Sequence, residues 1–307
     1  MEYQSSYIKL FQEGILKEKV DTAMKHLEKC TLCPHECGVN RKEKPGFCKA
    51  SDKVLVSSHG PHCGEEAELV GTNGSGTIFF GYCNLRCVFC QNFELSFGGE
   101  GDLISNESLA EIMLRLQNDY KCHNINLVTP THFVPNILEA LYFAAVKGLK
   151  LPLVYNCGGY ERLETLRLLA GVIDIYMPDF KYNLEEQGRK YSGVKDYPAH
   201  VKQSLKEMHR QVGGLKTDRR GVAYKGLIIR HLMMPGGLAE TKEILDFIAK
   251  ELSSDCLVNI MDQYYPAHRA HEYVELNQRV SRKDWKEAVA YANKLGLRLQ
   301  KAKPISR

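Results

Sequence analysis

Residues 82–92 read Tyr-Cys-Asn-Leu-Arg-Cys-Val-Phe-Cys-Gln-Asn and lie just beyond a short apolar run at residues 77–80. Cys83, Cys87 and Cys90 therefore form a Cys-x3-Cys-x2-Cys pattern at the end of a predicted strand. Three thiolates at this spacing can hold one face of a [4Fe–4S] cluster, whereas a closed cluster takes four. One iron is then open to a small molecule that chelates it through amino and carboxylate groups. The alternative is a structural zinc or closed-cluster loop that takes a fourth ligand from elsewhere.

The rest of the chain after about residue 67 alternates short apolar runs with amphipathic segments. The segments carry helix-start signals, such as Ser105 before an apolar helical pattern, Pro135, and the capping box Ser281-Arg-Lys-Asp284. Such alternation predicts parallel strands joined by right-handed crossovers, in an open doubly wound sheet or part of a barrel. In both folds the chemistry belongs at the carboxyl ends of the strands. The predicted strands are residues 77–80, 125–128, 151–155, 172–176, 227–229 and 257–260.

The first 66 residues differ in composition from the remainder. Residues 1–29 are predicted to be helical, and residues 30–66 are rich in Cys, His and Pro without a sustained period. We therefore predict an N-terminal metal-binding lobe at residues 1–66 and a core domain at residues 67–307. The spacing of four thiols in the lobe suits either tetrahedral zinc or an auxiliary closed cluster, and spacing does not choose between them. These thiols are Cys30, Cys33, Cys37 and Cys48.

Composition limits the class of protein. The chain has 307 residues and 11 cysteines, and its net charge of +4 is too weak to argue for a nucleic acid partner. No apolar run approaches the roughly 18 residues that a membrane helix needs, and the first residues lack the pattern of a signal peptide. Clustered thiols in a chain of this size are better explained as metal ligands than as disulfides. A cytoplasmic protein without a membrane partner is therefore expected.

The Cys-x3-Cys-x2-Cys pattern at a first strand end, with Phe89 before the third cysteine, resembles the signature of radical S-adenosylmethionine (SAM) enzymes. Other stretches resemble the branch of pyruvate formate-lyase activating enzyme-like proteins, specifically the PflX-type group. The resemblance extends from about Cys30 to the last predicted helix. The matching stretches are residues 71–92, 124–132, 154–160, 174–181, 230–231 and 261–264.

This resemblance implies a partial (β/α)6 TIM-type barrel with a small Cys-rich N-terminal lobe. It also implies a radical SAM oxidoreductase that uses a [4Fe–4S] cluster to cleave SAM reductively into methionine and a 5′-deoxyadenosyl radical. That radical would abstract hydrogen from a protein or peptide substrate, and a flavodoxin- or ferredoxin-type reductant would supply the electron.

Further candidate cofactor-binding residues stand near the predicted strand ends. Thr129 and His132 follow the second strand, and Asn156 follows the third. Asp179 and Lys181, after the fourth strand, resemble the Asp-x-Lys of the activating enzymes, in which the Lys meets the SAM carboxylate. Arg230, at the end of the fifth strand, suits a bidentate carboxylate contact better than lysine would.

Two other functions remain open at the level of sequence. One is a radical SAM enzyme that modifies RNA or a small molecule, although the modest charge weighs against RNA. The other is a non-catalytic zinc or iron–sulfur binding protein. The second alternative predicts that the side chains at the strand ends do not share a cavity. The residues that test it are Asn156, Asp179, Lys181 and Arg230.

Overall fold

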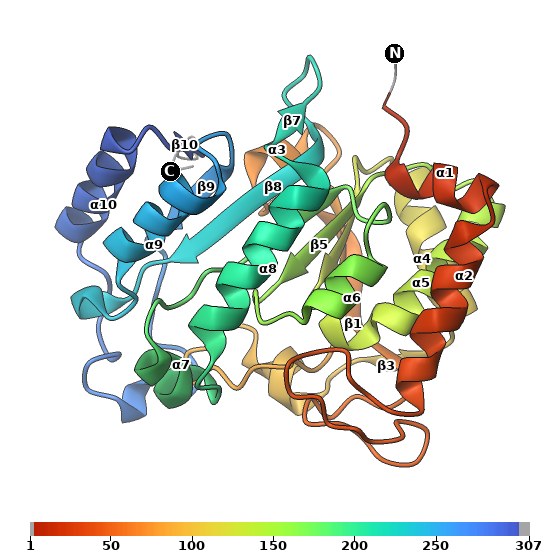
Figure 1. Cartoon of the computed structure of the whole chain (residues 1–307), viewed down its shortest axis with the longest axis horizontal. Coiled ribbons are helices and arrows are strands. Elements are labelled where there is room, and N and C mark those ends of the chain that lie inside the picture. Colours follow the sequence, from red (N-terminus) through yellow and green to blue (C-terminus); the bar gives the residue numbers. More distant parts are fainter. Residues whose placement is uncertain (1–2, 301–307) are drawn as a thin grey trace.

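One mostly parallel sheet organises the computed structural model, which describes residues 3–300 (Figure 1). Its strand order is β10-β9-β8-β6-β5-β4-β2-β1-β3, with β7 paired antiparallel to β8. The parallel part runs from β2 to β10 and confirms the α/β prediction. The strands are β1 (Val54–His62), β2 (Ser75–Phe80), β3 (Asp102–Ile104), β4 (Ile125–Val128), β5 (Leu153–Cys157), β6 (Ile175–Pro178), β7 (Lys216–Thr217), β8 (Ala223–Leu232), β9 (Leu257–Met261) and β10 (Arg298–Leu299).

Helices cover the outer face of this sheet, and several begin where the sequence predicts. The Oγ atom of Ser105 accepts a hydrogen bond from Ser108 N at 3.2 Å, and Ser281 caps α10 in the same way through Asp284 N. The α-helices are α1 (Ser6–Gln12), α2 (Ile15–Met24), α3 (Ala67–Val70), α4 (Asn106–Asn118), α5 (Val134–Val146), α6 (Leu163–Leu168), α7 (Glu185–Ser192), α8 (Tyr197–Val212), α9 (Thr241–Phe247) and α10 (Arg282–Lys294). Short turns of 3-10 helix are η1 (Lys25–Leu27), η3 (Thr131–Phe133), η4 (Pro235–Gly237) and η6 (Ala270–Glu272), and the π-helices are η2 (Glu94–Gly98) and η5 (Ile248–Leu252).

The long strand β1 has no counterpart in the sequence prediction. It pairs antiparallel with both β2 and β3, and so joins the N-terminal segment to the same sheet as the core. Only its first residues, Val54, Leu55 and Val56, are apolar and buried, while the second half is polar and largely exposed. This half lacks the alternation of buried and exposed side chains by which a strand is recognised.

The parallel strands curve into an incomplete barrel, and α3 fills its opening at the amino ends of the strands. Leu69 of this helix packs into a buried cluster with inward-facing residues of the strands, among them Val154, Ile175, Ile228 and Leu257. Glu66, just before α3, accepts a hydrogen bond from Asn259 Nδ2 of β9 at 3.2 Å, so the segment links the two sides of the barrel. The opposite end, where the parallel strands finish, carries the cysteine loop. None of the helices described between residues 3 and 300 has the length and apolar character to cross a membrane.

Candidate active site

The loop after β2 carries Cys83, Cys87 and Cys90. Tyr82, directly before the first cysteine, has a φ of +69°, which turns the chain sharply away from the strand. Residues of α7 hold the loop, since Arg86 N donates to Ser192 O at 3.0 Å and Val88 N donates to Tyr191 O at 2.8 Å. Cys87 Sγ also lies 3.0 Å from Ser192 Oγ.

The three thiols influence one another electrostatically. Burial, reinforced by the neighbouring thiols, raises the pKa of Cys83 to about 12. Burial likewise raises the pKa of Cys87 to about 11, and the ammonium of Lys181 acts in the opposite direction. The cysteines and Lys181 therefore share one site, in which a bound cation would favour the thiolate forms.

Asp179 links the ends of three strands. Its carboxylate accepts hydrogen bonds from Lys181 Nζ at 2.7 Å and from Arg230 Nε at 2.8 Å. Arg230 Nη2 donates a further bond to Asn156 Oδ1 at 2.7 Å. Burial alone would raise the pKa of Asp179, but Arg230 and Lys181 outweigh it and keep the pKa below its ordinary value. Four candidate residues are thus brought together as one network, which we call the Asp179 network: Asn156, Asp179, Lys181 and Arg230.

Thr129 contacts this network, and Phe89 lies in the cysteine loop. Thr129 N donates to Asn156 O at 2.8 Å, and its φ of +59° is rarely adopted by a β-branched residue. Such strain at a strand end is typical of functional sites. The ring of Phe89 is buried, with its centroid 6.2 Å from that of Tyr182 and 6.0 Å from that of Tyr264.

His132 is not brought to the Asp179 network. It is buried, its Nε2 lies 2.8 Å from Gly81 O, and its carbonyl accepts a hydrogen bond from Arg41. Burial lowers the pKa of its imidazole to about 3, so the ring is neutral. The hydrogen bond to Gly81 packs the segment after β4 against the start of the cysteine loop.

The four N-terminal cysteines gather in the lobe before β1. Backbone hydrogen bonds from Cys30 N to Val39 O and from Gly38 N to Cys30 O, both 2.9 Å, fold residues 30–39 back on themselves. Phe47 N donates to Cys37 Sγ at 3.3 Å. Burial raises the pKa of Cys33 and of Cys48, and the surrounding thiols add to both shifts. The four thiols therefore lie in one region, although within residues 3–300 they do not converge as closely as a single bound ion would require.

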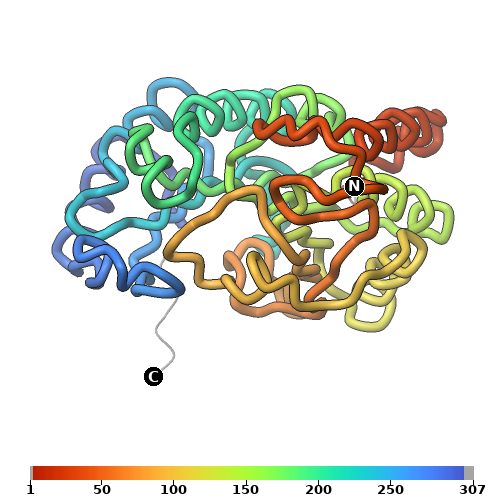
Figure 2. The backbone as a smooth tube through the Cα atoms, turned by 90° about the horizontal axis from the view of Figure 1, so that it is seen from below, coloured from red at the N-terminus to blue at the C-terminus, as the bar shows by residue number. Residues whose placement is uncertain are grey.

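This lobe lies against the cysteine loop of the core, as Figure 2 shows. His35 Nε2 is 2.8 Å from Asn84 O. The guanidinium of Arg86 lies 4.5 Å from the centre of the Phe47 ring, and its Nη1 donates to Cys83 O at 2.8 Å. The N-terminal lobe and the cysteine loop, which carry the two sets of cysteines, therefore contact each other directly.

The donor set of the cysteine loop fits a [4Fe–4S] cluster. Within residues 3–300, no three Cys, His, Asp or Glu side chains converge as closely as a single metal ion requires. A cubane cluster does not require such convergence, because each thiolate binds a different iron. Cys83 and Cys90 are partly exposed, so the loop is not fully enclosed by the rest of the protein.

Glu161 is a buried acid that the sequence analysis did not single out. Its carboxyl accepts hydrogen bonds from Thr131 Oγ1 at 2.7 Å and from Tyr155 OH at 3.0 Å, behind the ends of β4 and β5. Burial raises its pKa to about 7. No sequence pattern marks this residue as a buried acid, because one of its two partners, Thr131, lies 30 positions away.

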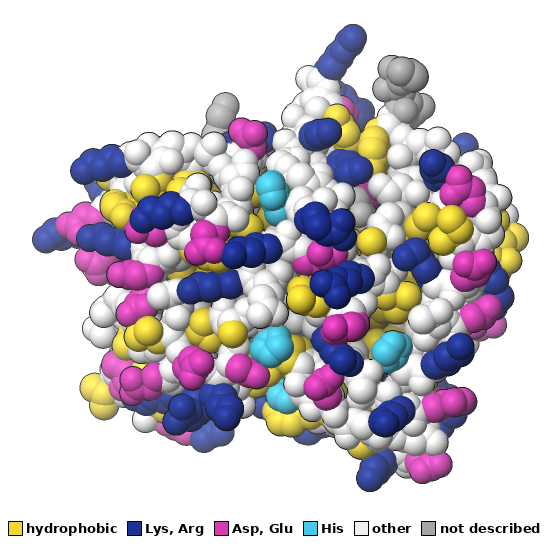
Figure 3. Space-filling view, in the orientation of Figure 1, with side chains coloured by type: hydrophobic (Ala, Val, Ile, Leu, Met, Phe, Trp, Pro, Cys, Tyr) yellow, Lys and Arg dark blue, Asp and Glu magenta, His cyan; other side chains and the backbone are white. Residues whose placement is uncertain are grey.

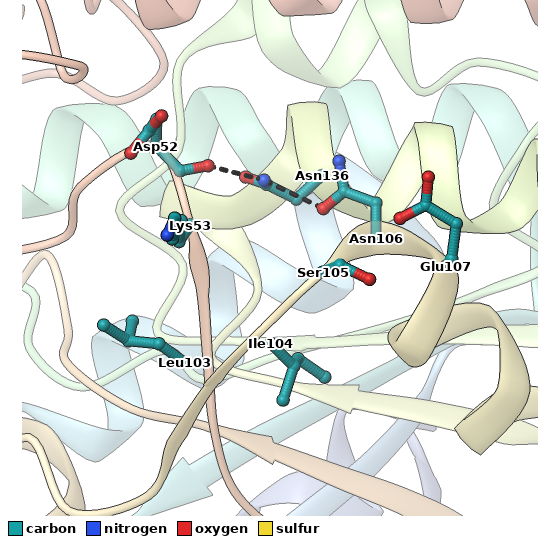
Figure 4. Close-up of a pocket in the computed structure, with 8 residues that line it drawn as sticks. All are labelled: Asp52, Lys53, Leu103, Ile104, Ser105, Asn106, Glu107 and Asn136. Atoms are coloured by element: carbon teal, nitrogen blue, oxygen red, sulfur yellow. Dashed lines mark hydrogen bonds between the residues drawn. The ribbon is translucent and has the colours of Figure 1, made fainter.

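A cavity of about 310 Å³ opens between the β3–α4 connection and α5, as Figure 4 shows. Asn136 crosses its wall, donating to Asp52 O at 2.8 Å and to Asn106 Oδ1 at 3.0 Å. None of the predicted site residues lines this cavity, so it is separate from the candidate active site.

Comparison with known families decides the identity of the core. The family model of the radical SAM superfamily matches residues 77–248, which is more than half of the chain. The chain belongs to the radical SAM superfamily. The match begins in β2, immediately before the cysteine loop, and ends in the region of α9. Membership identifies this radical SAM protein as an enzyme that uses SAM, and it implies a [4Fe–4S] cluster.

Two relatives of this radical SAM protein come from Methanocaldococcus jannaschii. Uncharacterized protein MJ0674 is 34% identical over 296 residues, covering 93% of this chain and 80% of the relative. Uncharacterized protein MJ0808 is 23% identical over 189 residues, covering 57% of this chain and 54% of the relative.

Among solved structures, Streptococcus suis SuiB bound to S-adenosylmethionine matches with 14% identity and a TM-score of 0.49, covering 73% of this chain and 49% of SuiB. SuiB bound to its precursor peptide SuiA matches with 15% identity and a TM-score of 0.48, covering 71% of this chain and 46% of SuiB. The radical SAM protein thus spans about half the length of SuiB.

Proposed function

We propose that this protein is an activating-enzyme-like radical SAM oxidoreductase of the PflX-type group that abstracts hydrogen from a protein or peptide. The observation that supports it most is the Asp179 network beside the cysteine loop. Cys83, Cys87 and Cys90 would hold the [4Fe–4S] cluster. When bound, that cluster supplies the electron that cleaves SAM into methionine and a 5′-deoxyadenosyl radical.

The side chains around the loop would position SAM. The ammonium of Lys181 would pair with the SAM carboxylate, because a charged hydrogen bond is strong in a site shielded from water. Asp179 would orient Lys181 and Arg230 through the bonds that it already accepts from both. Asn156 and Thr129 offer hydrogen-bonding groups at the neighbouring strand ends, and Phe89 offers an aromatic edge.

Exposed aromatic side chains near the cysteine loop support a polypeptide substrate. Phe47 is 41% exposed, Phe93 is 36% exposed and Tyr265 is 42% exposed. Phe47 contacts Arg86 of the loop, and the ring of Phe93 stacks on His268 with centroids 5.0 Å apart. Aromatic residues are enriched where proteins bind one another.

Two of the alternatives, a non-catalytic metal-binding protein and an RNA-modifying enzyme, fit the structure less well. A non-catalytic metal-binding protein gives no reason for four strand-end side chains to join in one network, as they do. For an RNA-modifying enzyme we would expect a continuous basic surface, whereas Figure 3 shows basic and acidic side chains interspersed on the face that it presents.

The proposal includes a second metal site formed by Cys30, Cys33, Cys37 and Cys48, which would hold zinc or an auxiliary cluster. It also includes a flavodoxin- or ferredoxin-type reductant and a reducing, cytoplasmic compartment. Disulfide bonds are rare in such a compartment, and the eleven cysteines are free thiols.

The direct test is SAM cleavage by protein reconstituted anaerobically with iron and sulfide. With dithionite and SAM, the wild-type protein should form 5′-deoxyadenosine, and a Cys87→Ala variant should form none. A Cys256→Ala variant is the matched control, because this buried cysteine directly precedes β9, at the amino end of a parallel strand, whereas the cysteine loop follows the carboxyl end of β2. Absence of 5′-deoxyadenosine from a wild-type sample whose cluster is visibly reduced would refute the function.

A further inference from the structure

Ser192, the last residue of α7, carries a buried hydroxyl group that the proposed SAM site does not use. Its Oγ lies 3.0 Å from Cys87 Sγ, although the two residues are 105 positions apart in the chain. The other hydroxyl contact to the loop cysteines among residues 3–300 is longer, since Ser96 Oγ lies 3.5 Å from Cys90 Sγ. Ser192 is therefore the hydroxyl best placed to influence a metal-binding sulfur of the loop.

The backbone holds Ser192 in this position. Arg86, directly before Cys87, donates from its N atom to Ser192 O at 3.0 Å, so the end of α7 is joined to the loop beside the sulfur. Gly193 follows the helix with a φ of +72°, and a Cβ at this position would lie 3.3 Å from Arg86 Cβ. The glycine therefore ends α7 in the left-handed conformation and allows the helix end to approach the loop closely.

Tyr182 adds a second hydroxyl group behind the first. Its OH lies 3.1 Å from Ser192 Oγ, and its side chain is fully buried. Within the part of the chain that the structure describes, Ser192 Oγ is the one group to which this phenol is hydrogen-bonded. The thiol and the two hydroxyls thus form a continuous row, which we call the Cys87–Ser192–Tyr182 chain.

Binding of a metal by Cys87 sets the direction of both bonds in this chain. A thiol can donate or accept a hydrogen bond, but the thiolate that ligates iron has no proton and only accepts. Ser192 must then donate its single hydroxyl proton to Cys87 Sγ, and its oxygen is left to accept from Tyr182 OH. The two bonds point the same way, and each strengthens the other in surroundings shielded from water.

We propose that Ser192 is a positioning residue that acts through Cys87: its hydroxyl, oriented by Tyr182, donates to the sulfur and raises the reduction potential of the cluster. This inference rests on the proposed function, which places the cluster on the loop cysteines. On reduction the reductant loses one electron, the cluster gains it, and no proton leaves the Cys87–Ser192–Tyr182 chain. A hydrogen bond to the sulfur stabilises the added negative charge, so loss of the hydroxyl makes the cluster harder to reduce.

The test is a redox titration of the reconstituted protein, followed by electron paramagnetic resonance in the absence of SAM. The part of the titration that is missing from Cys87→Ala belongs to this cluster. Ser192→Ala should lower the reduced-to-oxidised ratio of the cluster about tenfold at a fixed potential, which is a negative shift of about 59 mV for one electron. Tyr182→Phe keeps the donor to Cys87 but removes the group that orients it, so the shift should be smaller and in the same direction.

Ser204→Ala is the matched control, because this serine is equally buried and its Oγ donates to Glu161 O at 3.3 Å rather than to a cysteine. Its midpoint potential should equal that of wild type. Equal midpoints in Ser192→Ala and Ser204→Ala would overturn the inference.

If Ser192→Ala takes up no cluster, Tyr182→Phe decides, and a wild-type midpoint in that variant would overturn the inference. Either result, in a protein whose wild type forms 5′-deoxyadenosine, would leave the proposed function intact. A wild-type protein that assembles no cluster on the loop cysteines would instead overturn both.

Discussion

At the scale of single residues, the candidate site depends on a few charged groups held out of water. Asp179 accepts from two cations at 2.7 and 2.8 Å, so its carboxylate fixes the positions of Lys181 and Arg230 before any cofactor arrives. Preorganised charges of this kind bind a charged ligand without first having to be ordered. Because these charges are already in place, the loss of one of them should have a large effect on cofactor binding.

Replacing Lys181 by Ala should weaken SAM binding about tenfold or more, because a charge-assisted hydrogen bond of about 1.5–3 kcal/mol is lost. Isothermal titration of the reconstituted protein measures this directly. Lys286→Ala, on the exposed face of α10, serves as the control. An unchanged dissociation constant in Lys181→Ala would remove this residue from the SAM site.

Glu161 gives a pH dependence whose sign follows from its raised pKa. Between its ordinary value of 4.5 and the folded value of about 7, the native carboxyl keeps a proton that the unfolded chain has released. Stability from this group is therefore present at low pH and is lost as the pH rises to 7, amounting to about 3 kcal/mol. Denaturation at pH 5 and pH 8 should show a smaller decline in Glu161→Gln than in wild type or in the exposed control Glu186→Gln. Identical declines in all three would contradict the assignment.

At the scale of elements, most of the barrel could be predicted because its signals are local. Apolar runs marked the parallel strands, and Ser105 and Ser281 marked helix starts that the structure confirms. The strand β1 was missed because its second half is polar. The bond between Asp179 and Arg230 joins strands 51 positions apart, and no local pattern contains it. The strand ends could thus be predicted as candidates, but their hydrogen-bonded partners could not.

The contact between the lobe and the cysteine loop leads to a prediction for Arg86. This side chain donates to Cys83 O and covers the Phe47 ring, so it joins the two elements. Arg86→Ala should make the loop more mobile and speed the loss of iron to a chelator several-fold. The rate can be followed by the decay of cluster absorbance, with exposed Arg189→Ala of α7 as control. Equal rates in both variants would show that the lobe does not support the loop.

At the scale of the whole molecule, the two segments that carry the cysteine sets lie side by side and contact each other through residues next to the cysteines. Groups from the lobe reach the loop through His35 and Phe47, so a metal in the lobe would lie close to the proposed cluster. This arrangement suits either a structural support for the loop or an electron path to it. Metal content distinguishes the sites, because each set can be removed separately.

A variant with Cys83, Cys87 and Cys90 all replaced by Ala should retain metal in the lobe. Iron with equal sulfide in this variant would identify an auxiliary cluster, and one zinc per chain would identify a structural ion. Elemental analysis after anaerobic reconstitution provides the measurement. Complete absence of both metals, in a variant that remains folded by circular dichroism, would exclude the second site.

The most direct measurement of the central claim is electron paramagnetic resonance of the reduced protein with and without SAM. An open iron on the Cys83–Cys87–Cys90 cluster predicts that SAM changes the spectrum of wild type and of a variant lacking the four lobe cysteines. A spectrum that SAM leaves unchanged in both samples, despite full reduction, would contradict the account.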